Sequence, residues 1–340
     1  MLIFFRMTST HIAVIYMGGT FGSIGVPLYP MPAKAFLEKL QQHSVQHQFS
    51  SLQAQSLHFY EAPSIKDSSE LSAIDWLGLA QQIFELSNHF QHFIIIHGTD
   101  TLHYAAAFLS HLFADRLHII LTGSQLPLLE QSGANLHPSS DAWANYQFSI
   151  EQIKDIAQGC YIAFACKLHH ANQSIKAHTS EFDAFQSNPL PRRWQSVVQE
   201  FGLHQIEQWL SQVKDIRIAN LYCVPSSPDH LASELDTFQQ NSPHILILQA
   251  FGAGNLAYSA SLKSALQNLI AKKCWVIISS QVLFGELTND YAVASWLTEL
   301  GVVVDPHYSQ ADLYARCVLL YLQYADQPNW QTYWRNKAIS

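Results

Sequence analysis

The stretch that decides the fold is Phe93-Ile94-Ile95-Ile96-His97-Gly98-Thr99-Asp100-Thr101. Four consecutive apolar residues without alternation are typical of a parallel strand that is buried on both faces. The hydroxyl of Thr99 and the carboxylate of Asp100 follow at the carboxyl end of this strand, where open α/β sheets place their ligands. The stretch therefore predicts an α/β fold and a candidate site at one edge of its sheet.

A second threonine occurs in the same context near the start of the chain. The run Ile12-Ala13-Val14-Ile15-Tyr16 predicts a strand, and Gly18-Gly19-Thr20 predicts the turn that leaves it. The glycines permit a tight turn that exposes the Thr20 hydroxyl, although a threonine that only caps the next element fits the same residues. The turn lacks the GxGxxG pattern of dinucleotide-binding folds. Together with Thr99, it predicts two hydroxyl nucleophiles directed into one crevice.

Strand-like and helix-like segments alternate through the first half of the chain. This alternation predicts a mostly parallel sheet with helices on both faces. Ser72 is a typical N-cap, and Asp75 lies in the first turn of the helix that it would begin. The expected strands are 11–16, 93–96, 118–121 and 161–165, and the expected helices are 72–86 and 102–113.

The pattern changes at the turn-rich segment Asn188-Pro189-Leu190-Pro191-Arg192-Arg193, which favours a linker between domains. We expect an N-terminal catalytic α/β domain over 1–190, a linker over 191–215 and a smaller C-terminal α/β domain over 216–340. In the latter, the expected strands are 216–224, 244–250 and 275–279, and the expected helices are 256–271 and 290–300.

The composition excludes several classes of protein. With 48% hydrophobic and 13% charged residues among 340, the chain is typical of a well-buried enzyme. The formal net charge of −8 and the lack of a Lys/Arg stripe argue against nucleic acid and anionic membranes as partners. No stretch approaches the roughly 18 apolar residues of a membrane span. Residues 1–6 lack the basic region of a secretory signal, so we expect a cytoplasmic protein.

Cysteine and histidine usage indicates neither disulfides nor a metal site. The five cysteines are scattered without a CxxC pair, which favours buried free thiols and a reducing compartment. His169, His170 and His178 lie close in sequence, but their spacing is not that of a zinc site. We therefore expect no metal and no other cofactor.

Several motifs carry a family resemblance. Met17-Gly18-Gly19-Thr20-Phe21-Gly22 resembles the TGGTI-G signature of bacterial-type L-asparaginases, and residues 97–101 match their second signature, HGTDT. The segment 122–128 resembles their TGSQxPL, and 251–255 resembles their YGxGN. The resemblance thus extends over nearly the whole chain, and it is most similar to the cytoplasmic type I group.

The resemblance also implies residue roles that spacing alone does not give. Lys176 and residues 182–185 resemble the segment TKAHxxxFDAF, whose lysine is catalytic, and Tyr29 fits the tyrosine of a mobile lid. Residues 67–69 resemble the DSS segment that binds the α-amino and α-carboxylate groups, and Asn255 resembles an asparagine that approaches a neighbouring subunit's site. The implied catalytic residues are Thr20, Tyr29, Thr99, Asp100 and Lys176, and the implied substrate-binding residues are Asp67, Ser68, Ser69, Thr99, Asp100 and Asn255.

The activity that the resemblance implies is hydrolysis of L-asparagine to L-aspartate and ammonia, through a threonine nucleophile and an acyl-enzyme, in a homodimer or homotetramer. The sequence does not choose between Thr20 and Thr99 as the acylated residue. Two alternatives stay open. One is a non-catalytic sensor of asparagine or aspartate. The other is the asparaginase-like subunit of a tRNA-dependent amidotransferase, which carries an extra N-terminal domain.

The chain also departs from the family pattern. Met17 and Ile175 replace threonines beside Thr20 and Lys176, and Ser140-Asp141-Ala142 is the nearest match to the family's RSDG. Gln249 and Val282 stand where regulated type I members have an arginine and a cysteine, which argues against activation by asparagine. None of these departures removes a residue of the implied catalytic set.

Overall fold

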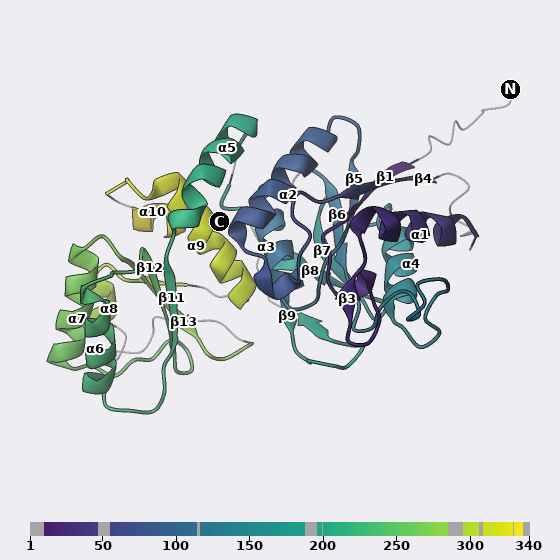
Figure 1. The fold of residues 1–340 in the computed structure, drawn as a ribbon. Coiled ribbons are helices and arrows are strands. Elements are labelled where there is room, and N and C mark those ends of the chain that lie inside the picture. The colour runs from purple at the N-terminus through teal and green to yellow at the C-terminus, as the bar shows by residue number, and fades with distance from the viewer. Residues whose placement is uncertain are drawn as a thin grey trace, which may run out of the picture. The chain divides into compact units, whose positions relative to one another are not determined.

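The computed structural model describes residues 10–46, 55–113, 116–187, 196–198, 200–284, 295–305, 309–328 and 330–335. Its contacts divide the chain into two compact units, which Figure 1 draws as a ribbon. The first unit contains residues 1–187 and 199–210, and the second contains 188–198 and 211–340. The range 191–215, for which the sequence predicts a linker, includes the helix α5 (Leu203–Gln212).

The first unit is built on a six-stranded sheet with the order β4-β1-β5-β6-β7-β8 in the described residues. All neighbours are parallel except β7 and β8, which confirms the predicted, mostly parallel sheet. The strands are β1 (Thr10–Tyr16), β4 (Gln55–Glu61), β5 (His92–Ile96), β6 (His118–Thr122), β7 (Gly159–Phe164) and β8 (Lys167–His170).

Strand β4 is the one strand of this sheet's parallel part that the apolar-run analysis does not predict. Among the described residues it lies at the sheet's edge and pairs with β1 alone. Its apolar residues Leu57 and Phe59 alternate with polar ones and are only partly buried. An edge position therefore explains why β4 lacks the continuous apolar run of the central strands.

Helices cover both faces of the first sheet, as Figure 1 shows. Side chains of α1 (Ala33–Gln46) and α4 (Ala142–Gln152) join those of β1 and β5 in one apolar core. The helices α2 (Ala73–Leu86) and α3 (Leu102–Phe113) pack together on the other face, where Trp76 meets Phe108. The predicted helix start at Ser72 is confirmed by a capping box with Asp75.

Two small hairpins complete the first unit. β2 (Ser23–Ile24) pairs with β3 (Tyr29–Pro30), and β9 (Ser174–Lys176) pairs with β10 (Phe185–Ser187), both antiparallel. Each hairpin carries one residue of the implied catalytic set, namely Tyr29 on β3 and Lys176 on β9.

The second unit contains a four-stranded parallel sheet in its described residues, which confirms the predicted smaller α/β fold. The predicted helix over 256–271 begins only at residue 260, after the N-cap Ser259, and the first part of the one over 290–300 lies outside the described residues. The strands are β11 (Ile218–Tyr222), β12 (Ile245–Ala250), β13 (Trp275–Ser280) and β14 (Val303–Val304); the helices are α6 (Pro228–Asp236), α7 (Ala260–Ala271), α8 (Ser295–Glu299), α9 (Gln310–Tyr324) and α10 (Trp330–Arg335).

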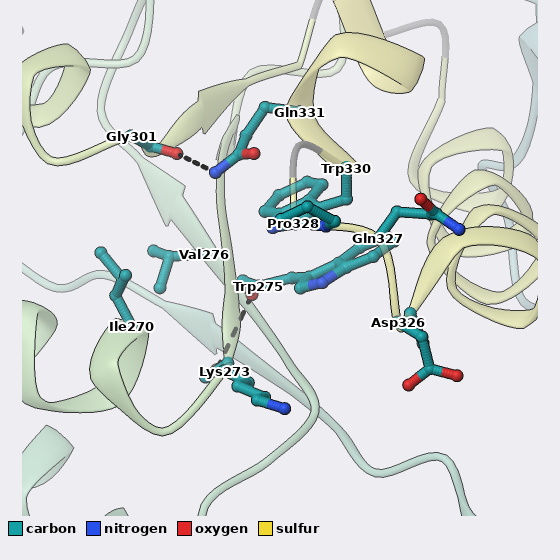
Figure 2. A pocket seen from close by; sticks show the side chains of 12 residues that line it. Ile270, Lys273, Trp275, Val276, Gly301, Asp326, Gln327, Pro328, Trp330 and Gln331 are labelled. Atoms are coloured by element: carbon teal, nitrogen blue, oxygen red, sulfur yellow. Dashed lines mark hydrogen bonds between the residues drawn. The ribbon is translucent and has the colours of Figure 1, made fainter.

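The second unit also contains a hollow of about 310 Å³ near the amino end of β13 (Figure 2). The rings of Trp275 and Trp330 stack there with their centroids 4.0 Å apart. The residues that line this hollow include none of the implied catalytic or substrate-binding residues.

The free cysteines partly match expectation. Four are buried, whereas Cys166 is exposed because it lies in the turn between β7 and β8. Within the described part of the chain, no helix combines the length and the apolarity needed to cross a membrane.

Candidate active site

The turns that leave β1 and β5 touch through two glycines. Gly19 has a φ of 84°, and a Cβ atom on it would lie 2.4 Å from the Cα atom of Gly98. A Cβ atom on Gly98 would lie 2.6 Å from the Oγ atom of Ser68. The absence of side chains at both positions therefore lets three predicted site segments, 18–20, 67–69 and 97–101, meet at one edge of the sheet.

Thr20 begins the short 3-10 helix η1 (Thr20–Gly22), directly after this contact, and is half-buried. The carbonyl of Phe21 accepts a 3.0 Å hydrogen bond from the N–H of Leu128, in the segment that follows β6. Thr20 thus stands at the carboxyl end of β1, and its helix is bordered by the segment from the end of β6. This is the position that the sequence predicts for it.

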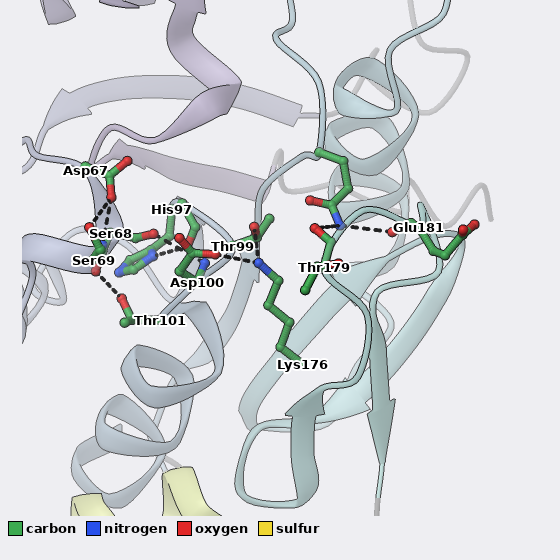
Figure 3. A network of polar contacts seen from close by, with 12 residues as sticks. Asp67, Ser68, Ser69, His97, Thr99, Asp100, Thr101, Lys176, Thr179 and Glu181 are labelled. Carbon is green, nitrogen blue, oxygen red and sulfur yellow. Dashed lines mark hydrogen bonds and ion pairs between the residues drawn. The ribbon is translucent and has the colours of Figure 1, made fainter. Parts of the chain in front are cut away.

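Lys176 joins the two residues of the second signature. Its Nζ atom donates to the Oγ1 atom of Thr99 at 2.9 Å and to the Oδ1 atom of Asp100 at 2.6 Å (Figure 3). Thr99 is buried, and the lysine side chain is only 15% exposed, whereas that of Asp100 is 61% exposed. An ammonium group that binds both partners fixes the orientation of the Thr99 hydroxyl. Sequence reasoning without the resemblance would not select this lysine.

Asp67 presents a carboxylate that its own loop keeps ionised. It precedes the 3-10 helix η3 (Ser68–Glu70), and its Oδ1 atom accepts from the hydroxyl of Ser69 at 2.6 Å and from its N–H at 2.9 Å. These hydrogen bonds, the hydroxyl's foremost, lower the pKa of Asp67 below its ordinary value. The exposed carboxylate therefore suits a cationic group on a ligand.

The loop that carries Asp67 is fastened to the second signature. The carbonyl of Ser68 accepts from the hydroxyl of Thr101 at 2.6 Å, and the Oγ atom of Ser68 accepts from the N–H of Asp100 at 3.3 Å. Figure 3 shows these contacts side by side with the Lys176 pair. The structure thus brings together Asp67, Ser68, Ser69, Thr99, Asp100 and Lys176, six of the predicted site residues.

Two histidines near this network, the buried His97 and the half-buried His103, are neutral. The Nδ1 atom of His97 lies 2.8 Å from the carbonyl of Gly98, and its Nε2 atom accepts from Trp76 at 3.4 Å, which assigns the proton to Nδ1. Burial lowers the pKa of His97 to about 4. Burial, followed by the charge of Lys176, lowers the pKa of His103 to about 3. His97 therefore shapes the turn rather than carrying charge.

Among the described residues, no hydrogen bond or ion pair joins the side chain of Thr20 or Tyr29 to this network. The Tyr29 side chain is exposed on the β2–β3 hairpin, and its ring covers Gly25, where a Cβ atom would lie 2.4 Å from the ring. Asn255 lies in the second unit, in a turn closed by paired hydrogen bonds with the backbone of Phe251. The lid role of Tyr29 and the approach of Asn255 to another subunit stay predictions.

The sequence reasoning missed a second carboxylate that anchors the site. Asp141 precedes α4, but instead of capping the helix it accepts from the N–H groups of Gln125 and Leu126 at 3.0–3.1 Å. The Nδ2 atom of Asn145 donates to the same carboxylate at 3.1 Å and to the carbonyl of Gly123 at 3.0 Å. A single Asp before a helix signals an N-cap, so only the contacts show that this residue fixes the turn after β6.

The chain is similar to known proteins over nearly its whole length. Residues 11–206 match the family model described as "Asparaginase, N-terminal". The chain is similar to L-asparaginase 1 of Escherichia coli, with 25% identity, covering 98% of this chain and 97% of that protein. The L-asparaginase I structure from Vibrio cholerae matches with a TM-score of 0.74 and 23% identity over 97% of both chains. The L-asparaginase from Thermococcus kodakarensis matches with a TM-score of 0.75 and 20% identity over 95% of this chain and 96% of that chain.

The contact between the two glycines predicts that Gly19→Ala destabilises the protein. The new Cβ atom would meet Gly98 at 2.4 Å on a backbone with positive φ, so we expect a loss of about 3 kcal/mol in the free energy of unfolding. Equilibrium unfolding in urea measures this loss. Gly202→Ala is the control, because nothing lies within 4 Å of its added Cβ atom. Equal stabilities of the two variants would contradict the prediction.

The buried neutral His97 predicts a pH-dependent stability. Its folded pKa of about 4 lies below the ordinary 6.5, so the unfolded chain binds a proton that the folded protein does not. The contribution of neutral His97 to the free energy of unfolding is complete above pH 6.5. It is lost as the pH falls toward 4, by up to about 1.4 kcal/mol per pH unit. Urea titrations between pH 7 and pH 4.5 should show a shallower dependence for His97→Gln than for the wild-type protein. Identical slopes of unfolding free energy against pH in the two proteins would refute this prediction.

Proposed function

The chain belongs to the asparaginase family, and from this premise we propose that it hydrolyses the side-chain amide of L-asparagine to L-aspartate and ammonia. The observation that carries the proposal is the contact of Lys176 with both Thr99 and Asp100 at 2.9 and 2.6 Å. This contact unites residues that lie 76 and 77 positions apart in the sequence. Hydroxyl, carboxylate and ammonium groups held together in this way are equipped for proton transfer during acyl transfer.

Recognition of the substrate's amino-acid end falls to the loop at residues 67–69. The ionised Asp67 pairs with the α-ammonium group, because a carboxylate only accepts hydrogen bonds and an ammonium only donates them. The oxygen of the Ser68 hydroxyl accepts from the N–H of Asp100, so its proton can be donated to the α-carboxylate. The Ser69 hydroxyl, in contrast, already donates to Asp67. Because Ser68 is bonded to Asp100 and Thr101, this arrangement holds the substrate at a fixed distance from the catalytic residues.

The proposed reaction has two halves. In the first, the Thr20 hydroxyl oxygen forms a bond to the amide carbon and loses its proton, with Tyr29 assisting. The C–N bond then breaks, ammonia leaves with the added proton, and Thr20 remains as an ester. In the second, water adds to the ester carbon and gives up a proton, and the Thr20 oxygen leaves and regains one. Two easier steps thus replace one difficult amide cleavage.

The Thr99, Asp100 and Lys176 group serves the second half in this scheme. Lys176 already binds the Thr99 hydroxyl, so Thr99 is held ready to orient the attacking water. Backbone N–H groups at the turns after β1 and β5 would stabilise the oxyanion of each tetrahedral intermediate. The scheme routes no step through a metal or an organic cofactor. A homodimer or homotetramer would supply Asn255 from a neighbouring subunit.

Ammonia release from L-asparagine tests the proposal. We expect turnover by the wild-type protein, and a fall in kcat of about 10³-fold or more for Thr20→Ala, Thr99→Ala and Lys176→Met, since each removes a member of the reacting unit. L-glutamine, measured in parallel, should react about 10- to 200-fold less well if the pocket fits the shorter side chain.

Matched variants separate loss of chemistry from loss of structure. Thr237→Ala and Lys167→Met remove an exposed hydroxyl and an exposed ammonium elsewhere in the chain, and both should retain wild-type turnover. Thermal unfolding should be similar for all five variants. Binding of asparagine without any ammonia release by the wild-type protein would replace this function by that of a sensor.

The role of Asp67 predicts a defect in binding rather than in chemistry. Asp67→Asn removes the charge that pairs with the α-ammonium, a bond of about 1.5–3 kcal/mol, so KM should rise about 10- to 100-fold while kcat changes little. The control is Glu70→Gln, an exposed carboxylate on the short helix that Asp67 precedes, which should leave both constants unchanged. A drop in kcat alone would contradict the assignment.

A further inference from the structure

The lysine of the candidate site stands on a hairpin whose tip is exposed. Lys176 ends β9, and residues 177–183 form the exposed connection to β10. The base of the hairpin is closed by the N–H of Ala177, which donates to the carbonyl of Ala184 at 2.8 Å. Across the strands Lys176 pairs with Phe185, which is buried. The hairpin base is thus well held, whereas its tip needs another attachment.

Gln125 supplies that attachment. Its side-chain Nε2 atom donates to the carbonyl of Glu181 at 3.0 Å and to the carbonyl of Thr179 at 3.4 Å. Figure 3 labels the two residues whose carbonyls accept these bonds, Thr179 and Glu181. Because both acceptors are backbone carbonyls, the carboxamide fixes the path of the chain rather than the rotamer of one side chain.

The backbone of Gln125 is itself held by hydrogen bonds. Its N–H donates to both carboxylate oxygens of Asp141, at 3.1 and 3.0 Å, and Asn145 donates to the same carboxylate. Asn145 also accepts from the N–H of Ala165, in the turn after β7. Hydrogen bonds through Gln125 therefore connect the tip of the hairpin to the turns at the carboxyl ends of β6 and β7.

A second link to the same tip is weaker. Lys167 pairs with Asp183, but their side chains are 55% and 54% exposed. Exposed ion pairs contribute little because water and salt screen them. Hydrogen bonds from an anchored carboxamide do not depend on ionic strength in this way, so Gln125 is the better candidate for holding the tip.

We propose that Gln125 is a positioning residue for Lys176: by holding the tip of the β9–β10 hairpin, it sets where the lysine ammonium meets Thr99 and Asp100. This inference rests on the proposed function and extends it to a residue with no predicted role. The ammonium would be located by the hairpin base, by its own two contacts and by the Gln125 contacts at the tip. Displacement of a reacting group by about 1 Å can cost 10²-fold in rate.

Kinetics of two Gln125 variants test the proposal. Gln125→Glu keeps the shape but has no N–H to donate, and Gln125→Ala removes the group. We expect both to lower kcat for asparagine about 10- to 100-fold, with KM changed less than threefold and thermal unfolding unchanged. Lys167→Met, which cuts the ion pair to the same tip, should change kcat less than twofold. Wild-type kcat in Gln125→Glu would overturn the proposal.

A double-mutant cycle shows whether Gln125 acts through the lysine. In a Lys176→Met background, Gln125→Glu should cause no further loss of the residual rate, because the group that it positions is gone. A full additional 10- to 100-fold loss in that background would mean that Gln125 acts on another part of the site, and the proposal would be wrong.

Proteolysis supplies a readout that does not depend on activity. Glutamyl endopeptidase cleaves after glutamate, and the Glu181 carbonyl is one of the two that Gln125 holds. We expect cleavage after Glu181 to be about tenfold faster in Gln125→Ala than in the wild-type protein. Unchanged cleavage, or faster cleavage with unchanged kcat, would overturn the positioning role. A wild-type protein without asparaginase activity would refute the proposed function, while the cleavage rates would still decide whether Gln125 holds the hairpin.

Discussion

The close contact between Gly19 and Gly98 is the constraint on which the rest of the site depends. Neighbouring parallel strands run about 4.8 Å apart, so the turns that leave β1 and β5 emerge side by side. With a Cβ atom at Gly19 only 2.4 Å from the Cα atom of Gly98, any other residue would push the turns apart. The threonines that follow, Thr20 and Thr99, would then be displaced relative to each other at this edge of the sheet.

Strand β5 is apolar and buried, whereas the turn that follows it carries polar groups. Ile94, Ile95 and Ile96 are fully buried, and their burial fixes where β5 ends at the edge of the sheet. Immediately beyond, the neutral His97 receives a hydrogen bond from Trp76 and bonds the carbonyl of Gly98. Polar groups that would be costly in the core are therefore satisfied locally, and the charged groups begin only where the site opens to water.

Long-range polar contacts complete what the parallel sheet begins. Lys176 reaches the β5 turn from a hairpin, and Ser68 reaches it from the loop after β4. Asp141 fixes the turn after β6. Each contact joins segments that lie far apart in the sequence, so the site forms only when the sheet and its loops are all in place. This dependence favours precise geometry, which the proposed acyl transfer needs.

The sequence by itself determined the parallel α/β fold, most central strands, the helices α2, α3 and α7 and the two glycine-threonine turns, because apolar runs, caps and glycines act locally. The sequence did not reveal the helices α1, α4, α6 and α9. It did not reveal β4, since an edge strand buries less, or α5, which lies in the range predicted as a linker. Lys176 was reached only through a family resemblance. The roles of Gln125 and Asp141 were decided by tertiary structure alone, because hydrogen bonds across 54 and 16 positions leave no local signal.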